Sequence, residues 1–331
     1  MNLTWRTLTR DDSAAMAELC AAVEAVDDEG ESYGTEDIEA DFDSPSVDEA
    51  HGSRGGFLDG RLIVAGMLFA RTAADPVHQM FFWGMVHPDF RRRGHGTALT
   101  EWALDAAARI SEERFPGAPG ELRFDVDEKH TGALALVRKC GFTARHYEFG
   151  MEATLAGREP SSRLPPEGFA LVGFSPSLSE EIRQTHNIAF VPDHPGSTVA
   201  TVETWPRQIL HEGTSFHADL SFSLRDERTG LLAGYLIAQY YEADTAATGL
   251  RDIYLAYIGT RREYRGRGVA STLIRAALDG AVEAGFDSAS LQVLAENPTG
   301  ALGVYERAGF TVRRRYIAHS RALKQGTMGD S

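Results

Sequence analysis

The feature that most constrains this chain is an internal repeat. An Arg/Gly-rich segment at residues 86–99 has a counterpart at 262–273, and a segment ending in Gly-Phe at 133–142 has a counterpart at 301–310. The two motifs come in the same order and at a similar separation in both halves of the 331-residue chain. Such self-similarity over long segments indicates two copies of one fold.

A segment rich in Pro, Gly and Ser separates the two halves. Residues 157–168 show no apolar periodicity, and this composition is typical of a linker. We therefore expect an N-terminal domain over 1–156, this linker, a C-terminal domain over 169–325 and a flexible tail over 326–331. Each expected domain is long enough to bury a core of its own.

Both halves have the same predicted order of elements. A short strand and amphipathic helices precede antiparallel-type strands, and a further strand then enters the Arg/Gly-rich loop, which opens a long helix. Asp59-Gly60, between two apolar runs, is a hairpin signal. The expected strands include 3–9, 80–86, 122–126, 169–173, 220–225, 231–241, 252–260 and 288–293, and the expected helices include 13–26, 97–110, 177–190 and 270–284. This alternation predicts an α/β fold of the α+β type.

Composition and charge exclude several classes of protein. The formal net charge of −15 argues against general nucleic-acid binding. No apolar run is long enough for a membrane span and residues 1–10 lack the features of a signal peptide, so we expect a cytoplasmic protein. Cys20 and Cys140 lie in apolar helical patterns that favour buried thiols, and no Cys/His group has metal-ligand spacing, so no metal is expected.

One acidic stretch has two interpretations. Residues 11–53 contain no Lys or Arg but many Asp and Glu residues. A run of this kind is usually a solvated acidic face. The alternative is the mouth of a site that attracts a cationic amine.

The repeated strand–loop–helix segment is suited to binding an anion. The first amides of a helix have no partner within the helix, and the helix dipole adds positive charge at that end. Glycines let the backbone come close to a phosphate, as in Arg265-Gly-Arg-Gly-Val-Ala270 and Arg91-Arg-Arg-Gly-His-Gly96. One such loop could simply join a strand to a helix, but two at matching positions favour a phosphate site. Neither loop has the P-loop or the dinucleotide pattern.

With Gly268 and Gly94 at matching positions, both loops resemble the pyrophosphate-binding motif of the GNAT (Gcn-type N-acetyltransferase) superfamily. Residues 297–310 resemble its closing motif, and the tandem arrangement is similar to that of mycothiol synthase-like actinobacterial acetyltransferases. The resemblance covers nearly the whole chain. It implies, in each domain, a mixed, mostly antiparallel sheet with splayed central strands, flanked by helices, and acyl-CoA bound in the splay.

The resemblance implies acetyl-CoA binding by the C-terminal domain and leaves binding by the N-terminal domain open. The strand before the loop would bond the pantetheine arm, and the loop amides would hold the pyrophosphate. The implied residues are Ile258, Gly259, Thr260, Arg265, Gly266, Arg267, Gly268, Val269, Ala270, Ser271 and Asn297 in the C-terminal domain, and Val86, Arg91, Arg92, Gly94, His95, Gly96 and Thr97 in the N-terminal domain.

The closing motif distinguishes the two halves. In the family pattern, a tyrosine four residues before the Gly-Phe pair protonates the leaving sulfur. That position holds Tyr305 in the second half and Val137, which has no proton to donate, in the first. The asparagine that begins the same helix is Asn297 in the second half and Lys129 in the first. The resemblance therefore implies that the C-terminal domain is catalytic and the N-terminal domain degenerate.

The residues that would contact the acceptor are less constrained. Asp252, Tyr254 and Tyr257 lie on the strand expected beside the acetyl group, and strict alternation places Tyr257 on the opposite face from the other two. Asp252 is a candidate base acting through a water; a structural role, or a mechanism without a protein base, is the alternative. Asp193 could hold a cationic acceptor and Trp205 could stack on it, whereas the alternative places Trp205 in the core.

Two hypotheses of different classes follow. The first is an acetyl-CoA-dependent N-acetyltransferase, a monomer or homodimer, that acts on the primary amine of a small molecule. The second is a non-catalytic acyl-CoA-binding or sensing protein. Tyr305 and Asn297 favour the first, and the degenerate first half favours the second.

Overall fold

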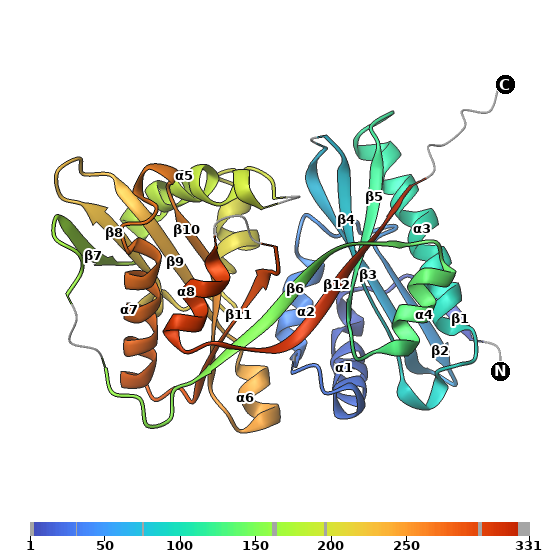
Figure 1. Cartoon of the computed structure of the whole chain (residues 1–331). Helices are drawn as coiled ribbons and strands as arrows, with labels where there is room; N and C mark the ends of the chain where they lie inside the picture. The colour runs from blue at the N-terminus through green and yellow to red at the C-terminus, as the bar shows by residue number, and fades with distance from the viewer. Residues whose placement is uncertain are drawn as a thin grey trace. The chain divides into compact units, whose positions relative to one another are not determined.

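The computed structural model describes residues 3–30, 32–74, 76–160, 164–194, 197–296 and 300–323. The chain divides into two compact units (Figure 1). Unit 1 comprises Met1–Tyr147 with Tyr316–Ser331, and unit 2 comprises Glu148–Arg315. Within the described residues, every helix is too short or too polar to cross a membrane.

Unit 1 contains the sheet order β1-β2-β3-β4-β5, in which only β4 and β5 are parallel. The hairpin between β2 and β3 is the predicted one, because Asp59 and Gly60 both have positive φ angles, of 50° and 82°, as a type I′ turn requires. The elements are β1 (Thr4–Arg6), α1 (Ser13–Asp27), α2 (Thr35–Phe42), β2 (Ser53–Leu58), β3 (Arg61–Ala74), β4 (His78–Val86), α3 (His95–Arg114), β5 (Gly120–Asp127), α4 (Thr131–Lys139) and β6 (Thr143–Thr154).

Unit 2 repeats this plan with the sheet order β7-β8-β9-β10-β11, in which only β10 and β11 are parallel. The elements are β7 (Phe169–Gly173), α5 (Ser179–Ala189), a π-helical turn (Trp205–Leu210), β8 (Phe222–Asp226), β9 (Leu232–Tyr240), α6 (Glu242–Thr248), β10 (Asp252–Thr260), α7 (Val269–Glu283), β11 (Ser288–Leu294), α8 (Ala301–Ala308) and β12 (Thr311–Ala322). The predicted bounds of β10 agree with the observed ones, and most others differ by one to four residues at an end.

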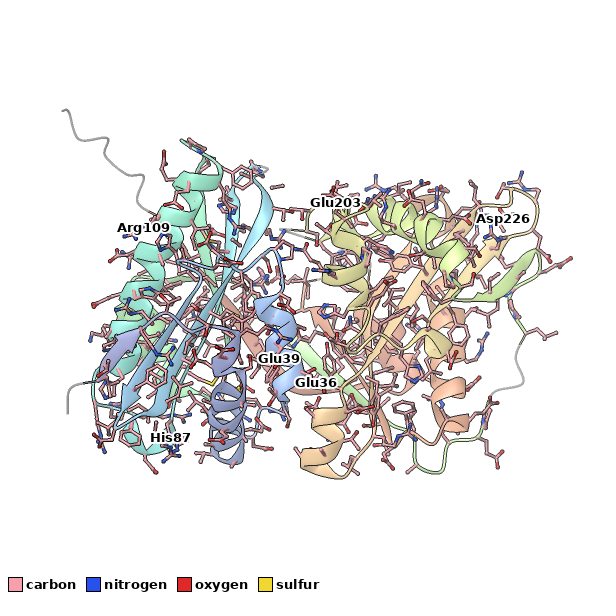
Figure 2. All side chains as sticks on the ribbon, turned by 180° about the vertical axis from the view of Figure 1, so that it is seen from behind. Glu36, Glu39, His87, Arg109, Glu203 and Asp226 are labelled. Carbon is pink, nitrogen blue, oxygen red and sulfur yellow. The ribbon has the colours of Figure 1, made fainter. Side chains whose placement is uncertain are left out.

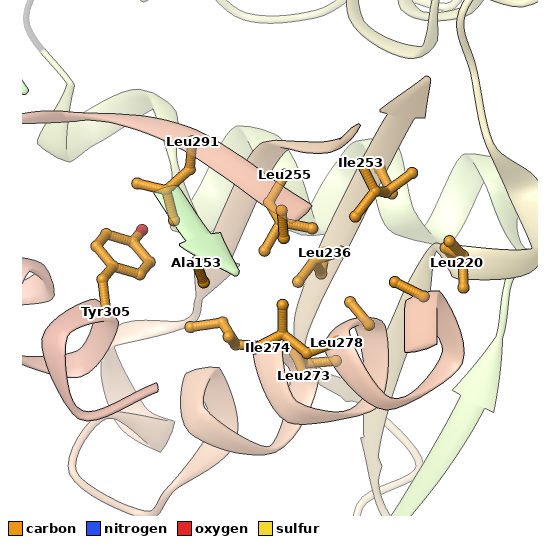
Figure 3. Close-up of a cluster of buried hydrophobic side chains, with 14 of the residues drawn as sticks. Ala153, Leu220, Leu236, Ile253, Leu255, Leu273, Ile274, Leu278, Leu291 and Tyr305 are labelled. Carbon is orange, nitrogen blue, oxygen red and sulfur yellow. The ribbon is translucent and has the colours of Figure 1, made fainter. Parts of the chain in front are cut away.

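Alternation along the strands gives each unit a core on both faces of its sheet. In unit 2, Leu236 and Leu255 face α7 and α8, and Figure 3 shows this cluster, with Tyr305 of α8 at its edge. Tyr235 and Ile237 face α5 on the other side. In unit 1, α3 and α4 cover one face, and α1 and α2 cover the other. The thiols of Cys20 and Cys140 are buried, as predicted.

The compact units differ from the predicted domains because the halves exchange their last strands. Residues 148–154 of β6 pair with β11 in unit 2. Residues 316–322 of β12 pair with β5 in unit 1, where Ile317 and Ala318 are buried. The segment predicted as a linker contains no helix or strand among its described residues; 161–163 lie outside them, as does the predicted tail.

Candidate active site

The central strands of unit 2 separate at one end. β10 and β11 pair only through 252–254 and 288–290. β10 then continues to Thr260 and β11 to Leu294 without further pairing to each other among the described residues. The separation leaves backbone groups on the inner edges of both strands available to a ligand that enters between them.

A β-bulge lies where β10 leaves β11. The register with β9 shifts between Leu255 and Tyr257, so Ala256 is an extra residue. The bulge overturns the expectation from strict alternation: Tyr257 pairs with Ile237 and Tyr254 pairs with Gln239, on the same face. Asp252, Tyr254 and Tyr257 therefore share the face opposite α7. In unit 1, by contrast, the pairing of β4 with β3 is regular from Met80 to Val86.

The end of β10 enters the predicted anion-binding loop. Gly266 and Gly268 have φ angles of 73° and 79°, in the left-handed region that favours glycine, and α7 begins directly after them at Val269. Arg265 donates from Nε to the carbonyl oxygen of Thr260 at 3.3 Å, and its guanidinium binds the carboxylate of Asp193. Because Gly266 and Gly268 carry no Cβ, a phosphate group can approach the loop backbone and the first amides of α7 closely.

A cavity of about 290 Å³ lies at this loop and reaches Tyr305. Its size is close to the lower end for small-molecule pockets. Most of the predicted cofactor residues at the end of β10 and in the loop line it, and α8 supplies the opposite wall. The lining residues are Ala189, Asp193, His194, Ile258, Thr260, Tyr264, Arg265, Gly266, Gly268, Val269, Ala270, Ser271, Ala301, Val304, Tyr305 and Arg307.

Tyr305 lies where the cavity meets the core. The residue is 9% exposed, and burial raises the pKa of its hydroxyl to about 12. Its ring packs edge-on against Phe310, and no described residue forms a hydrogen bond with its hydroxyl. A neutral tyrosine at this position is a proton donor at neutral pH. Asn297, predicted beside it, lies outside the described residues.

The backbone of Gly259, a predicted cofactor residue, packs against the buried ring of Tyr235, which in turn bonds to His186. A Cβ on Gly259 would lie 2.3 Å from the ring of Tyr235, so only glycine lets the ring pack against this backbone. The hydroxyl of Tyr235 shares a 2.7 Å hydrogen bond with Nδ1 of His186. Burial lowers the pKa of His186 to about 4, so its ring is neutral at pH 7.

Two predicted substrate contacts have partners within the protein. Trp205 is 3% exposed in the core beside α5, and its indole N–H donates to Ser179 at 3.0 Å. Asp193 lines the cavity, but its carboxylate binds Arg265. The alternative of a core tryptophan is therefore confirmed, and the negative charge of Asp193 serves to orient the loop arginine.

Asp252 lies at the paired end of β10, about 26 Å along the strand from Thr260. Its carboxylate accepts hydrogen bonds from the hydroxyls of Ser288, at 2.6 Å, and Ser290, both on β11. Burial raises its pKa, although the two serines oppose the change, and nearby Glu152 raises it further. Asp252 does not line the cavity around Tyr305, and it lies on the same face as Tyr254.

Unit 1 contains the same arginine arrangement. Arg91 donates from Nε to the carbonyl oxygen of Val86 at 3.1 Å, and its guanidinium binds both carboxylate oxygens of Asp27 at 2.6 and 2.7 Å. Gly94 has a φ angle of 88° and α3 begins at His95. Arg91 and Asp27 therefore correspond in structure to Arg265 and Asp193 of unit 2.

Contacts from α4 and the segment before it reach this loop region in unit 1. Lys139 donates to the hydroxyl of Thr97 at 3.3 Å, and a Cβ on Gly96 would lie 3.2 Å from Leu136. Lys129 donates to the carbonyl oxygen of Asp28 at 2.5 Å. The contacts of Lys139 and Leu136 thus bring the chain's own side chains to the predicted cofactor positions Thr97 and Gly96.

The acidic stretch of unit 1 takes part in ion pairs. Glu36 and Glu39 lie on α2 (Figure 2), and Arg10 pairs with Glu39 at 2.8 Å. Asp27, Glu29 and His130 come close enough to hold a metal ion. Both carboxylate oxygens of Asp27 already bind a guanidinium, however, which disfavours a cation at the same atoms.

Both halves match family models of acetyltransferases. Residues 180–310 match the acetyltransferase (GNAT) family, and residues 57–144 match an acetyltransferase (GNAT) domain. A tandem pair of acetyltransferase domains is thus the class that the fold and the two loops define.

Relatives that are similar in sequence match more of the chain than either family model does. A mycothiol acetyltransferase of Saccharomonospora viridis is 30% identical over 251 residues, which cover 75% of this chain and 74% of that protein. Another, of Brachybacterium faecium, is 28% identical and covers 73% of this chain and 68% of its own. The chain therefore belongs to the GNAT acetyltransferase family.

Solved structures share the tandem fold. A GCN5-related N-acetyltransferase of Sphaerobacter thermophilus aligns with a TM-score of 0.75 at 23% identity, covering 98% of this chain and 96% of its own. A tandem GNAT protein of the clavulanic acid biosynthesis pathway aligns at 0.71 and 17% identity, covering 98% and 100%.

Proposed function

We propose that this protein is an acetyl-CoA-dependent N-acetyltransferase that acts on the primary amine of a small molecule, with catalysis in unit 2. The observation that carries the proposal is the cavity that joins the glycine loop before α7 to the hydroxyl of Tyr305. Unit 1 has a comparable loop, but Val137 replaces the tyrosine and β4 has no matching bulge. The relatives named mycothiol acetyltransferase support an acceptor of related chemistry.

The residues present fit acetyl-CoA at this site. The amides that open α7, with Gly266 and Gly268, would hold the pyrophosphate, and the end of β10 would bond the pantetheine arm. The bound molecule supplies an acetyl thioester. Tyr305 would donate a proton to the leaving sulfur. The raised pKa of Asp252 makes it a better base than an exposed aspartate, and it would take a proton through water from the ammonium group of the acceptor, because it does not line the cavity itself.

Turnover with a panel of amines tests this proposal. We expect release of CoA thiol from acetyl-CoA, together with acetylated product detected by mass spectrometry, for at least one small primary amine. The panel contains a mycothiol precursor, an aminoglycoside, a polyamine and a peptide N-terminus, and the thiol-containing acceptor is followed by product mass alone. Acetyl-CoA binding without turnover on a broad panel would instead support the alternative, a non-catalytic sensing protein.

Replacing Asp252 with asparagine tests the assigned base. The amide oxygen can still accept from one serine hydroxyl and the amide nitrogen can donate to the oxygen of the other, but the side chain cannot take a proton, so we expect kcat to fall by about 10²-fold. Steady-state kinetics with the best acceptor measure the effect, with exposed Asp219→Asn as the matched control. Equal kcat values for Asp252→Asn and wild type would leave Asp252 a structural role only.

A further inference from the structure

Tyr305 must regain a proton in every turnover if it protonates the leaving sulfur. Burial raises the pKa of its hydroxyl to about 12, so a tyrosinate left at this position is unfavourable. A group that faces the same cavity and exchanges protons near neutral pH would restore the hydroxyl.

Most ionisable groups that line the cavity have other roles. The carboxylate of Asp193 binds Arg265. Tyr264 donates its hydroxyl to the carboxylate of Asp226 at 3.0 Å. The arginines of the lining keep their protons at all relevant pH values. Among the described lining residues, His194 is the one left that titrates near neutrality.

The tautomer of His194 is set by its neighbour Phe190. Nδ1 of His194 lies 2.9 Å from the carbonyl oxygen of Phe190, and because a carbonyl only accepts, Nδ1 carries the proton. The imidazole also stacks on the ring of Phe190, with centroids 3.5 Å apart and planes 6° apart. Nε2 therefore presents a lone pair, and no described residue forms a hydrogen bond with it.

The surroundings keep this imidazole neutral. Burial lowers the pKa of His194 below 6.5, although the hydrogen bond to the carbonyl of Phe190 and the charges of Asp193 and Glu148 oppose the change, and Arg265 lowers it slightly further. His186, whose ring stacks on the same Phe190, is neutral because burial lowers its pKa to about 4. His194 is thus a proton acceptor in the resting protein at pH 7.

Unit 1 lacks this residue as well as the tyrosine. Asp27 corresponds to Asp193 through the shared arginine contact, and the residue that follows it is Asp28, where unit 2 has His194. The carbonyl oxygen of Asp28 accepts a hydrogen bond from Lys129. The pair of His194 and Tyr305 is therefore specific to unit 2.

We propose that His194 is the proton-transfer partner of Tyr305, an inference that rests on the proposed function. As the C–N bond forms, Nε2 of His194 accepts a proton from the attacking nitrogen. As the C–S bond breaks, the sulfur takes the proton of Tyr305. The protonated His194 then returns its proton to the tyrosinate, directly or through a water. Asp252 removes the first proton from the ammonium group through water, so one proton is released to solvent per turnover and both partners regain their starting states.

The test compares His194→Gln with wild type and with His217→Gln, whose ring is also in unit 2 but does not line the cavity. We expect His194→Gln to lower kcat by about 10²-fold while calorimetry shows unchanged affinity for acetyl-CoA. The wild-type pH profile of kcat should fall as pH drops below 6.5 through the lowered pKa of His194. That ionisation should be absent in His194→Gln and present in Asp252→Asn, and added imidazole should restore part of the activity of His194→Ala.

The outcomes distinguish a failure of the proposed function from a failure of the proposed role of His194. If wild type shows no turnover on the amine panel, the proposed function fails and the inference fails with it. If wild type turns over and His194→Gln keeps both its kcat and the ionisation, the proposed function stands and the role of His194 is refuted. Loss of acetyl-CoA affinity in His194→Gln, without a change in the pH profile, would show that the residue binds the thioester substrate rather than moves protons.

Discussion

Replacing Tyr305 with phenylalanine is expected to lower kcat by about 10²- to 10⁴-fold, the range typical of a lost general acid. The expected affinity for acetyl-CoA is that of wild type, because the ring still fills its place against Phe310. Without the hydroxyl, the sulfur must leave as a thiolate, and this raises the barrier to the step in which the C–S bond breaks.

The substitution should leave the rest of the structure unchanged, because no described residue forms a hydrogen bond with the hydroxyl of Tyr305. Its removal leaves no buried donor or acceptor unpaired, so the free energy of unfolding should change little. Tyr240→Phe is the matched control, since Tyr240 lies outside the cavity and donates its hydroxyl to Thr245 at 3.0 Å. Single-turnover kinetics with calorimetry of acetyl-CoA binding separate the chemical step from binding. A Tyr305→Phe protein with wild-type turnover on a good acceptor would remove Tyr305 from the mechanism.

Local signals in the sequence predicted much of the fold and the glycine loops that precede α3 and α7. The hairpin at Asp59-Gly60 and the glycine loops depend on positive φ angles that neighbouring residues determine. The strand 252–260 has its observed bounds because its apolar run is flanked by a glycine turn and a charged loop. These features require no knowledge of distant contacts.

Features that depend on distant pairing could not be predicted. The bulge at Ala256 appears only in the register of β10 against β9, and it moves Tyr257 to the face of Asp252. Trp205 is in the core because α5 covers it, which no short window of sequence shows. His194 was not singled out from the sequence, although it lies beside Asp193. The comparison of this segment with residues 27–28 of unit 1 depends on the shared arginine contacts, which only the structure shows.

The exchange of last strands is the largest such difference, and it leads to a prediction about truncation. A chain ending at Arg315 would lack Tyr316–Ala322, the strand that pairs with β5 in unit 1. It would also lose Ile317 and Ala318 from the core of that unit. Removing a buried isoleucine alone costs about 2–5 kcal/mol, a large share of the 5–15 kcal/mol that typically stabilises a domain. We therefore expect unit 1 to unfold, although the whole 1–156 segment is present.

Unit 2 should survive the same truncation, because residues 148–154 of β6 already supply its strand beside β11. Of the four tryptophans, Trp5, Trp83 and Trp102 belong to unit 1 and Trp205 to unit 2, so fluorescence during urea unfolding reports mainly on unit 1. Calorimetry of acetyl-CoA binding reports on unit 2. A chain ending at Leu323 keeps every strand pairing that the structure describes and serves as the control. If the chain ending at Arg315 instead unfolded at the same urea midpoint as the control, unit 1 would be stable without its pairing to β12. Residues 1–156 would then fold as the domain predicted from the sequence.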